Sequence, residues 1–453
     1  MRTRLLLRAI SIAGAVTLTL LVGGAALANP TSVPDNQPLP PYTISNPPMA
    51  PIMANGALTT VFQGVHEHAA YKVEVPAQWN GDLVVWAHGF RGQGTVLTVD
   101  APGFALRQKF VNEGFAWAAS SYTDNGYDIR AGVLSSKDIA EFFPDLTSKH
   151  PHRIFITGVS MGGHIIGRSV EQFPHFYDGA LPMCGVLGDQ TLFDFFLDYN
   201  LVGQDLAGVS AFPFPDDYGT VDIPKIEAAL GLTSLSPIGP DTTNDLGKQF
   251  RSIVINRSGG PRPGATPAFA FWKDFLFGLG IPSHAGTTLA QNPGQIAQNL
   301  STNYQPDTPV DVNATVVRVA PQNLPARHSA SLSQVPKILG HPEIPVLTLH
   351  GLGDLFVPFS MEQAYRQDID QTNRGDLVVQ RAIRTVNHCE FTPTEAGTAW
   401  DDLAAWVHTG NRPAGDDVLN TQVVADPNFG CQFSDKAAFA AGNGTRRLFA
   451  ACP

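Results

Sequence analysis

Residues 153–164 read Arg-Ile-Phe-Ile-Thr-Gly-Val-Ser-Met-Gly-Gly-His, and this stretch decides the fold. Its first part, Ile154–Thr157, has the β-branched and aromatic content of a strand that is buried on both faces. The residues after the paired glycines are predicted to form a helix. Ser160 therefore lies at a sharp turn, where Gly158 and Gly162 let the strand and the helix approach each other closely.

This strand–turn–helix motif resembles the nucleophile elbow of the α/β-hydrolases, in which the serine hydroxyl is exposed above the sheet. The resemblance covers about residues 57–184 and 345–410. It implies the α/β-hydrolase fold, a mostly parallel, doubly wound sheet, and a catalytic triad in the chain order serine, acid, histidine.

The order of predicted elements agrees with such a sheet. Segments 57–65 and 69–75 alternate apolar and polar residues, which predicts an antiparallel pair at the sheet edge. From Asp82 onward strands alternate with helices, as in parallel βαβ units. The predicted strands are 83–87, 115–121, 154–157, 179–183, 345–349 and 377–383, and the predicted helices include 104–112, 361–369 and 394–408.

The alternation stops between residues 184 and 345. This segment contains aromatic helices, and we predict a large, mainly helical cap inserted between two late strands. Its aromatic pairs, Phe193 with Phe196 and Phe271 with Phe275, fall on helical faces; most are expected to pack the cap onto the sheet and some to line the pocket. The expected organisation is a signal peptide (1–28), a proline-rich leader (29–56), a catalytic domain (57–185 and 345–413), the cap (186–344) and a tail (414–453).

Composition limits the partners of this chain. It has 453 residues, 43% of them hydrophobic and only 15% charged, with a formal net charge of -11. Nucleic acid and anionic membrane surfaces are excluded as favourable partners, because both repel a negative chain. Neutral or apolar substrates suit this surface, and we expect neither a metal nor an organic cofactor.

The first 28 residues have the pattern of a secretory signal. Arginines in the first eight positions precede an apolar run over 9–22, and Ala26-Leu27-Ala28 provides a small-residue cleavage site. An uncleaved N-terminal anchor is the alternative, since 9–28 is about long enough to span a bilayer. We predict export, extracellular or periplasmic, without stable membrane insertion after cleavage.

Four cysteines in an exported chain predict two disulfides, with three pairings open. The spacing favours Cys431 with Cys452 in the tail, which leaves Cys184 with Cys389. A metal site is the alternative, but no Cys-x-x-Cys spacing supports it.

The candidate acid and base follow late strands. Asp354 comes directly after a predicted strand, in a Gly-x-x-Asp-x-x-Val-Pro run that resembles the acid loop of the family. Asp189, after the preceding strand, is the rival acid. His388 lies in the loop after the last predicted strand, where the resemblance places the catalytic base.

Two backbone amides are predicted to form the oxyanion hole. Met161 follows the nucleophile at the positive end of its helix. The run His88-Gly-Phe-Arg-Gly resembles the His-Gly-x-x-Gly loop of secreted lipases and esterases, which implies the amide of Phe90 as the second donor. We expect His88 to fix this loop. Arg91 is expected either to be solvated or to pair with a substrate carboxylate.

A Cys184–Cys389 disulfide would hold His388 in position. In the tannases and fungal feruloyl esterases, a disulfide joins the residue before the serine to the residue after the histidine. Here Val159 occupies the first of those positions. Because the chain departs from that pattern, the substrates of that family are not carried over.

The sequence therefore predicts an exported serine hydrolase that cleaves carboxylic esters through Ser160, His388 and Asp354. The substrate is expected to be a bulky, aromatic or polymeric neutral ester, because the cap is large and aromatic. A secreted peptidase of the prolyl-peptidase type is one alternative, and a catalytically inactive binding protein on the same fold is another. The oligomeric state is left open.

Overall fold

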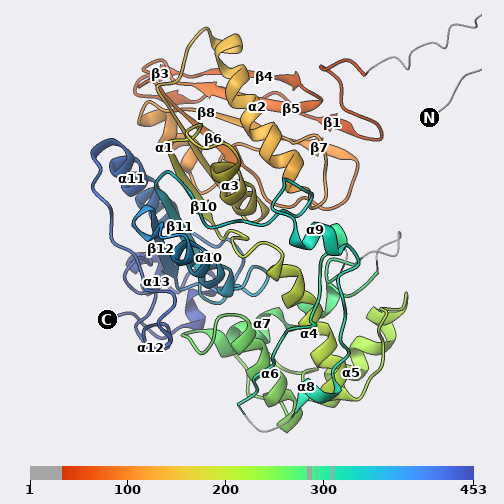
Figure 1. Ribbon diagram of the computed structural model, residues 1–453. Helices are drawn as coiled ribbons and strands as arrows, with labels where there is room; N and C mark the ends of the chain where they lie inside the picture. The colour runs from red at the N-terminus through yellow and green to blue at the C-terminus, as the bar shows by residue number, and fades with distance from the viewer. Residues whose placement is uncertain (1–32, 283–287, 292, 308–310) are drawn as a thin grey trace, which may run out of the picture.

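The centre of the molecule is an eight-stranded sheet with the order β12-β11-β10-β9-β6-β8-β5-β4 (Figure 1). The computed structural model describes residues 33–282, 288–291, 293–307 and 311–453, so the predicted signal peptide lies outside the described residues. β5 runs antiparallel to both β4 and β8, and the other described pairs of this sheet are parallel, which confirms the mostly parallel sheet. The strands are β4 (Thr60–His66), β5 (Ala69–Val75), β6 (Asp82–Ala87), β8 (Ala116–Ser120), β9 (Arg153–Val159), β10 (Gly179–Met183), β11 (Val346–Gly351) and β12 (Val378–Ile383).

The inner strands are buried on both faces, as the apolar runs predict. In β6, Leu83 and Val85 point into one hydrophobic core, whereas Val84 and Trp86 point into the other. Alternate side chains of a strand face opposite sides of the sheet, so a strand between two helical layers must be apolar throughout.

Helices cover both faces (Figure 1). The first core contains side chains of α2 (Ile129–Thr147), α3 (Met161–Gln172) and α10 (Ser360–Gln371). The second contains side chains of α1 (Leu106–Asn112) and α11 (Pro393–Thr409). These two layers make the sheet doubly wound, as expected.

A mainly helical insertion separates β10 from β11, which confirms the cap between two late strands. Figure 1 draws it in green and teal as a lobe beside the sheet. Its helices are α4 (Thr191–Ala207), α5 (Ile223–Leu230), α6 (Asp245–Arg257), α7 (Ala265–Gly278), α8 (Val312–Thr315) and α9 (Leu324–His328), with short turns η1 (Tyr218–Asp222) and η2 (Pro293–Gln295).

The predicted strand over 57–65 is wrong at its start. Residues Ala57–Leu58 form a separate strand, β3, that pairs with β2 (Met53–Ala54). Asn55 and Gly56 connect them with φ values of 50° and 82°. An Asn-Gly pair favours this tight hairpin turn, because both residues tolerate positive φ.

The ends of the described chain lie against the sheet domain. In the leader, β1 (Thr43–Ser45) pairs in parallel with β7 (Val96–Thr98). After η3 (Gly375–Leu377), β12 and α11, the tail contains α12 (Thr421–Val424), α13 (Lys436–Ala440) and η4 (Gly444–Leu448). Cys431 and Cys452 form a disulfide within it. Among the described residues, no helix combines the length and apolarity that crossing a membrane requires.

Candidate active site

Ser160 occupies the turn between β9 and α3 in a strained conformation, with φ 58° and ψ -122°. Glycines make this turn sterically feasible. A Cβ atom on Gly158 would lie 2.0 Å from the carbonyl oxygen of Ala87, and one on Gly162 would lie 2.2 Å from the same oxygen. Only glycine therefore allows the strand and helix on either side of Ser160 to pack against the end of β6.

The structure brings Ser160, His388 and Asp354 into one hydrogen-bonded chain. Nε2 of His388 lies 2.8 Å from Oγ of Ser160, and Nδ1 of His388 lies 2.5 Å from Oδ2 of Asp354. Asp354 is fully buried, and its Oδ1 accepts hydrogen bonds from the amides of Phe356 and Val357, both at 3.0 Å. With Nδ1–H donating to Asp354, Nε2 is free to accept the serine proton.

These side chains meet because each follows the carboxyl end of a strand. Ser160 follows β9, Asp354 follows β11 and His388 follows β12, and these strands run parallel in one sheet. Loops at that edge converge on one point above the sheet, which is where α/β sheets place their ligands.

Asp189, the rival acid, is held elsewhere. Oδ2 of Asp189 accepts a hydrogen bond of 2.9 Å from the amide of Ile338, and Oδ1 accepts one from the amide of Gln190. Burial raises the pKa of Asp189 to about 7. The structure therefore brings Asp354, and not Asp189, to His388.

The loop after β6 lies directly against Ser160. A Cβ atom on Gly89 would be 3.0 Å from Cβ of Ser160 and 3.5 Å from its Oγ. Phe90 follows Gly89 and lines the same pocket as Ser160. Met161 is the first residue of α3, and the first amides of a helix have no acceptor within that helix. Both amides predicted for the oxyanion hole thus belong to segments that border Ser160.

His88 fixes this loop. Its ring stacks on Tyr122, with centroids 4.0 Å apart, and its Nδ1 lies 2.7 Å from the carbonyl oxygen of Gly89. The hydroxyl of Tyr122 donates to the carbonyl oxygen of His88 at 3.1 Å. Burial lowers the pKa of His88 to about 3, so the imidazole stays neutral at physiological pH.

The expectation that Arg91 is solvated is wrong. Its guanidinium donates to the carbonyl oxygen of Thr98 at 2.8 Å and to Oδ2 of Asp100 at 2.5 Å. The side chain is only 18% exposed, because Thr98 of β7 and Asp100 accept hydrogen bonds from its two terminal nitrogens, and pairing with a substrate carboxylate stays a prediction. Arg91 therefore anchors the loop after β6 to β7.

An apolar cavity of about 20 Å³ adjoins the Ser160 side chain. This volume is close to that needed by a single water molecule, so the side chains almost fill the cavity. Most of its walls come from the loop after β6, from α4 and from the loop after β11. The full lining is Phe90, Tyr127, Ser160, Val186, Leu192, Phe193, Phe196, Leu289, Phe356 and Val357.

The predicted cap aromatics divide into two groups. Phe193 and Phe196 line the cavity, whereas Phe271 and Phe275 are 38% and 42% exposed on α7. Phe275 nevertheless contacts Phe356, with ring centroids 4.8 Å apart, and the ring of Phe356 lies 5.0 Å from that of His388.

A buried pair behind the cavity was missed by sequence reasoning. The hydroxyl of Tyr127 lies 3.0 Å from Nδ1 of His164, and Nε2 of His164 lies 2.8 Å from the carbonyl oxygen of Pro336. Burial lowers the pKa of His164 to about 4, so Nε2–H donates to Pro336 and Nδ1 accepts from Tyr127. The Tyr127 hydroxyl is thereby satisfied outside the cavity. His164 lies one helical turn after Ser160, and this spacing could have indicated from the sequence that it lies near the site.

The Cys184–Cys389 disulfide fastens the histidine loop to the end of β10, with Cα atoms 5.3 Å apart. The two sulfur atoms and the His388 ring lie within 4.8 Å of one another. Both sulfurs are in the disulfide, and it is the thiolate that binds a metal.

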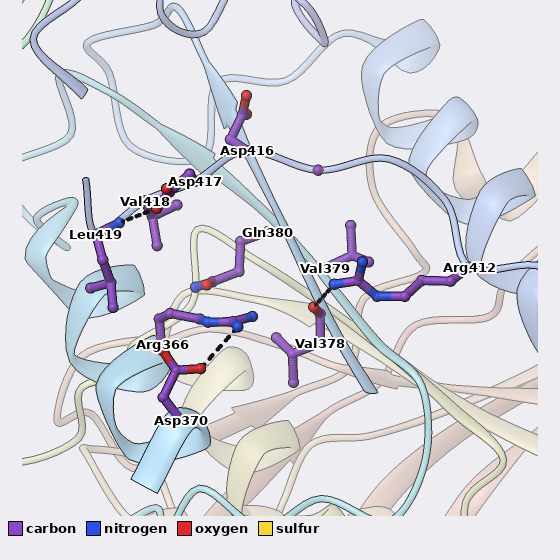
Figure 2. Close-up of a pocket in the computed structure, with 11 residues that line it drawn as sticks. Arg366, Asp370, Val378, Val379, Gln380, Arg412, Asp416, Asp417, Val418 and Leu419 are labelled. Carbon is purple, nitrogen blue, oxygen red and sulfur yellow. Dashed lines mark hydrogen bonds and ion pairs between the residues drawn. The ribbon is translucent and has the colours of Figure 1, made fainter. Parts of the chain in front are cut away.

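A larger cavity, of about 420 Å³, lies away from the triad between α10, β12 and the tail (Figure 2). Arg366 forms an ion pair of 2.8 Å with Asp370, and Arg412 donates to the carbonyl oxygen of Val378 at 2.8 Å. The walls of this larger cavity contain none of Ser160, His388 and Asp354.

The strand order, the sharp turn at Ser160 and the loops after β11 and β12 together define the α/β-hydrolase fold, which this chain has. No model of a protein family matches the chain.

Among characterised proteins, o-phthalyl amidase of Xanthobacter agilis is 22% identical over 424 residues, covering 79% of this chain and 89% of the amidase. Among solved structures, feruloyl esterase B from Aspergillus oryzae is 14% identical, with a TM-score of 0.43, covering 76% of this chain and 79% of the esterase. Tannin acyl hydrolase from Aspergillus niger is 11% identical, with a TM-score of 0.44, covering 79% of each chain.

Proposed function

We propose that this protein is an exported serine hydrolase that cleaves carboxylic esters whose acyl groups carry no charge. The observation that carries the proposal is the continuous chain from Oγ of Ser160 through His388 to the buried carboxylate of Asp354. A serine, a base in hydrogen-bond reach and an acid that orients the base are the parts that acyl transfer requires.

In the proposed reaction, Oγ of Ser160 attacks the acyl carbon while Nε2 of His388 takes the serine proton. The oxyanion is held by the amides of Phe90 and Met161. The bond to the leaving alcohol breaks as the His388 imidazolium returns its proton to that alcohol. Water then attacks the acyl-enzyme, His388 takes a proton from it, and the carboxylic acid leaves as Ser160 is restored.

The cavity beside Ser160 supports an uncharged acyl group. Its described walls are apolar apart from Ser160 itself and Tyr127, whose hydroxyl is bonded to His164. Burying a carboxylate there without a partner would cost far more than the apolar contacts contribute. Arg91, the nearby cation of the oxyanion loop, is already paired with Asp100.

An amide substrate is the second candidate, because the relative found among characterised proteins is named an amidase. The same triad cleaves either bond once the leaving group is protonated. Hydrolysis of a matched phenyl ester and anilide of one acid would decide between them. An anilide kcat/KM equal to or above that of the ester would favour the amidase.

Export remains part of the proposal. Two disulfides support it, since disulfides persist in oxidising compartments. The boundaries of the catalytic domain (57–185 and 345–413), of the cap (186–344) and of the tail (414–453) are likewise proposed.

The test is Ser160→Ala, with Ser331→Ala, an exposed cap serine, as the matched control. We expect Ser160→Ala to lower turnover of p-nitrophenyl esters by on the order of 10³-fold or more while the fold survives. A fluorophosphonate probe should label the wild type and the control variant but not Ser160→Ala. Full activity of Ser160→Ala, or a wild type that the probe does not label, would overturn the proposal.

A further inference from the structure

The loop that carries Asp354 is held by the cap as well as by the sheet. On the sheet side, the amide of Leu352 donates to the carbonyl oxygen of Ile383, and the amide of Gly353 donates to that of Thr385, both at 2.8 Å. The carbonyl oxygens of Leu352 and Gly353 are left for other donors. Both of them are bonded by side chains of the cap.

Trp272 of α7 is the first of these donors. Its indole Nε1–H lies 3.1 Å from the carbonyl oxygen of Gly353 and 2.9 Å from that of Val386. Gly353 immediately precedes Asp354, and Val386 stands two residues before His388. One buried indole therefore bridges the acid loop and the histidine loop.

Arg262, in the loop between α6 and α7, is the second donor. Its Nε donates to the carbonyl oxygen of Leu352 at 2.7 Å, and its other nitrogens donate to the carbonyl oxygen of Gly260 at 2.8 Å and to the hydroxyl of Ser258 at 3.2 Å. The side chain is only 7% exposed. All three acceptors are uncharged, so none of these bonds neutralises the guanidinium.

A cation buried among uncharged acceptors is costly unless an anion lies near enough to compensate. Burial lowers the pKa of Arg262 to about 10, and the charge of Asp354 is the influence that opposes this lowering. The charged and titratable groups around Asp354 are His388, Arg262 of the cap, and the buried pair of His350 on β11 with Glu362 on α10.

We propose that Arg262 and Trp272 are positioning residues through which the cap assembles the triad. Arg262 holds the acid loop at the carbonyl oxygen of Leu352, which places its buried charge two residues before Asp354 in the chain, and Trp272 sets the spacing between the acid and histidine loops. This inference rests on the proposed function, and it makes the cap a structural part of the catalytic centre as well as a cover for the substrate.

The test compares Arg262→Met, Arg262→Lys and Trp272→Phe with Arg251→Met, which removes a cap arginine that pairs with Asp241 instead. kcat and KM for a p-nitrophenyl ester are measured across pH for each full-length variant, together with its melting temperature. We expect Arg262→Met to lower kcat by about 10- to 100-fold with a smaller change in KM, because misplacing a catalytic group mainly affects turnover.

The pH profile separates the effect of the Arg262 charge from the effect of the hydrogen bonds that hold the loop. Without the Arg262 charge, the Asp354–His388 pair holds a proton more tightly, so the acid limb of kcat/KM should move to higher pH by about half a unit or more. Arg262→Lys keeps the charge and should leave the limb in place with partial recovery of kcat. Trp272→Phe should lower kcat without moving the limb, because it removes only hydrogen bonds.

An unmoved limb in Arg262→Met, with a kcat like that of Arg251→Met, would overturn the role of Arg262. If Arg262→Met does not fold, an Arg262→Lys limb that moves, or a folded Trp272→Phe with wild-type kcat, would overturn the inference. Each of these outcomes counts against the inference only if the wild-type protein hydrolyses the ester. An unlabelled, inactive wild type would instead refute the proposed function.

Discussion

Cys389, the residue after His388, is disulfide-bonded to Cys184 at the carboxyl end of β10. That strand is the neighbour of β9, and the amide of Ser160 donates to the carbonyl oxygen of Met183 at 3.1 Å. The disulfide thus joins the loop of His388 to the strand that borders Ser160. Under the proposed function, this link should affect catalysis, whereas the tail disulfide should not.

We expect Cys184→Ala/Cys389→Ala to lower kcat/KM about 10-fold or more, whereas Cys431→Ala/Cys452→Ala leaves it near wild type. Both variants should lose stability, because the disulfides close segments of 205 and 21 residues. Loop-closure entropy predicts losses of roughly 5 and 3 kcal/mol. Ester kinetics and thermal melts check this. Equal kcat/KM in the two variants would show that the Cys184 bond only stabilises the fold.

The hydrogen-bonded chain of Ser160, His388 and Asp354 could be predicted because each member follows a strand that the sequence marks. A continuous apolar run ends just before Ser160 and another just before Asp354, and parallel strands present such ends at one edge of the sheet. The glycines around Ser160 add a steric requirement that a reader of the sequence can recognise. The fold and the meeting of these three side chains are therefore encoded locally.

The hydrogen bonds that hold the loops of these residues in place are not encoded locally. Trp272 bonds the carbonyl oxygen of Val386, 114 residues away, and Oγ1 of Thr445 in the tail accepts from the amide of Val386 at 2.7 Å, 59 residues away. Neither residue belongs to a motif or a periodic pattern that names its partner. Such contacts depend on how the cap and the tail pack against the sheet, which a single sequence does not specify.

Asp354→Asn and Asp189→Asn should separate the two candidate acids. Asp354→Asn removes the charge that orients His388 and stabilises its imidazolium, so we expect kcat to fall on the order of 10³-fold or more. Asp189→Asn should keep kcat within a few-fold, since Asp189 bonds only backbone amides. Steady-state kinetics on one ester decide the point, and a larger loss in Asp189→Asn would reverse the assignment.

Asp189 should also affect stability in a pH-dependent way. Its pKa is raised to about 7 in the folded protein, above the value of about 3.9 in an unfolded chain. The folded state therefore binds the extra proton between these values, and the stabilising contribution is lost as pH rises through about 7. Urea unfolding of wild type and Asp189→Asn at pH 5 and pH 8 checks this. The variant should gain relative stability at pH 8, and a pH-independent difference would contradict the raised pKa.

The small cavity should restrict acyl chain length through Phe193. We expect wild-type kcat/KM to fall once the acyl chain exceeds the cavity of about 20 Å³. Phe193→Leu should recover longer chains, by about four-fold for each methylene it admits, since burying a methylene contributes about 0.8 kcal/mol. Phe271→Leu, at an exposed position of α7, is the control. An unchanged chain-length profile in Phe193→Leu would place the acyl group outside this cavity.

Gly89 should be essential for turnover because of the space beside Ser160. A methyl group at this position would lie 3.0 Å from Cβ of Ser160 and 3.5 Å from its Oγ, where an attacking ester must approach. We expect Gly89→Ala to lower kcat/KM about 100-fold. Gly94→Ala is the matched control for this prediction. It lies in the same loop, and a Cβ atom there would meet no described atom within 4 Å. Gly89→Ala should also melt at a lower temperature than Gly94→Ala, because Cβ of Ser160 and the carbonyl oxygen of Val159, 3.3 Å from the new methyl group, must shift to admit it. Activity is therefore compared at a temperature at which both variants are folded. Wild-type activity in Gly89→Ala would contradict the requirement for open space between this position and Ser160.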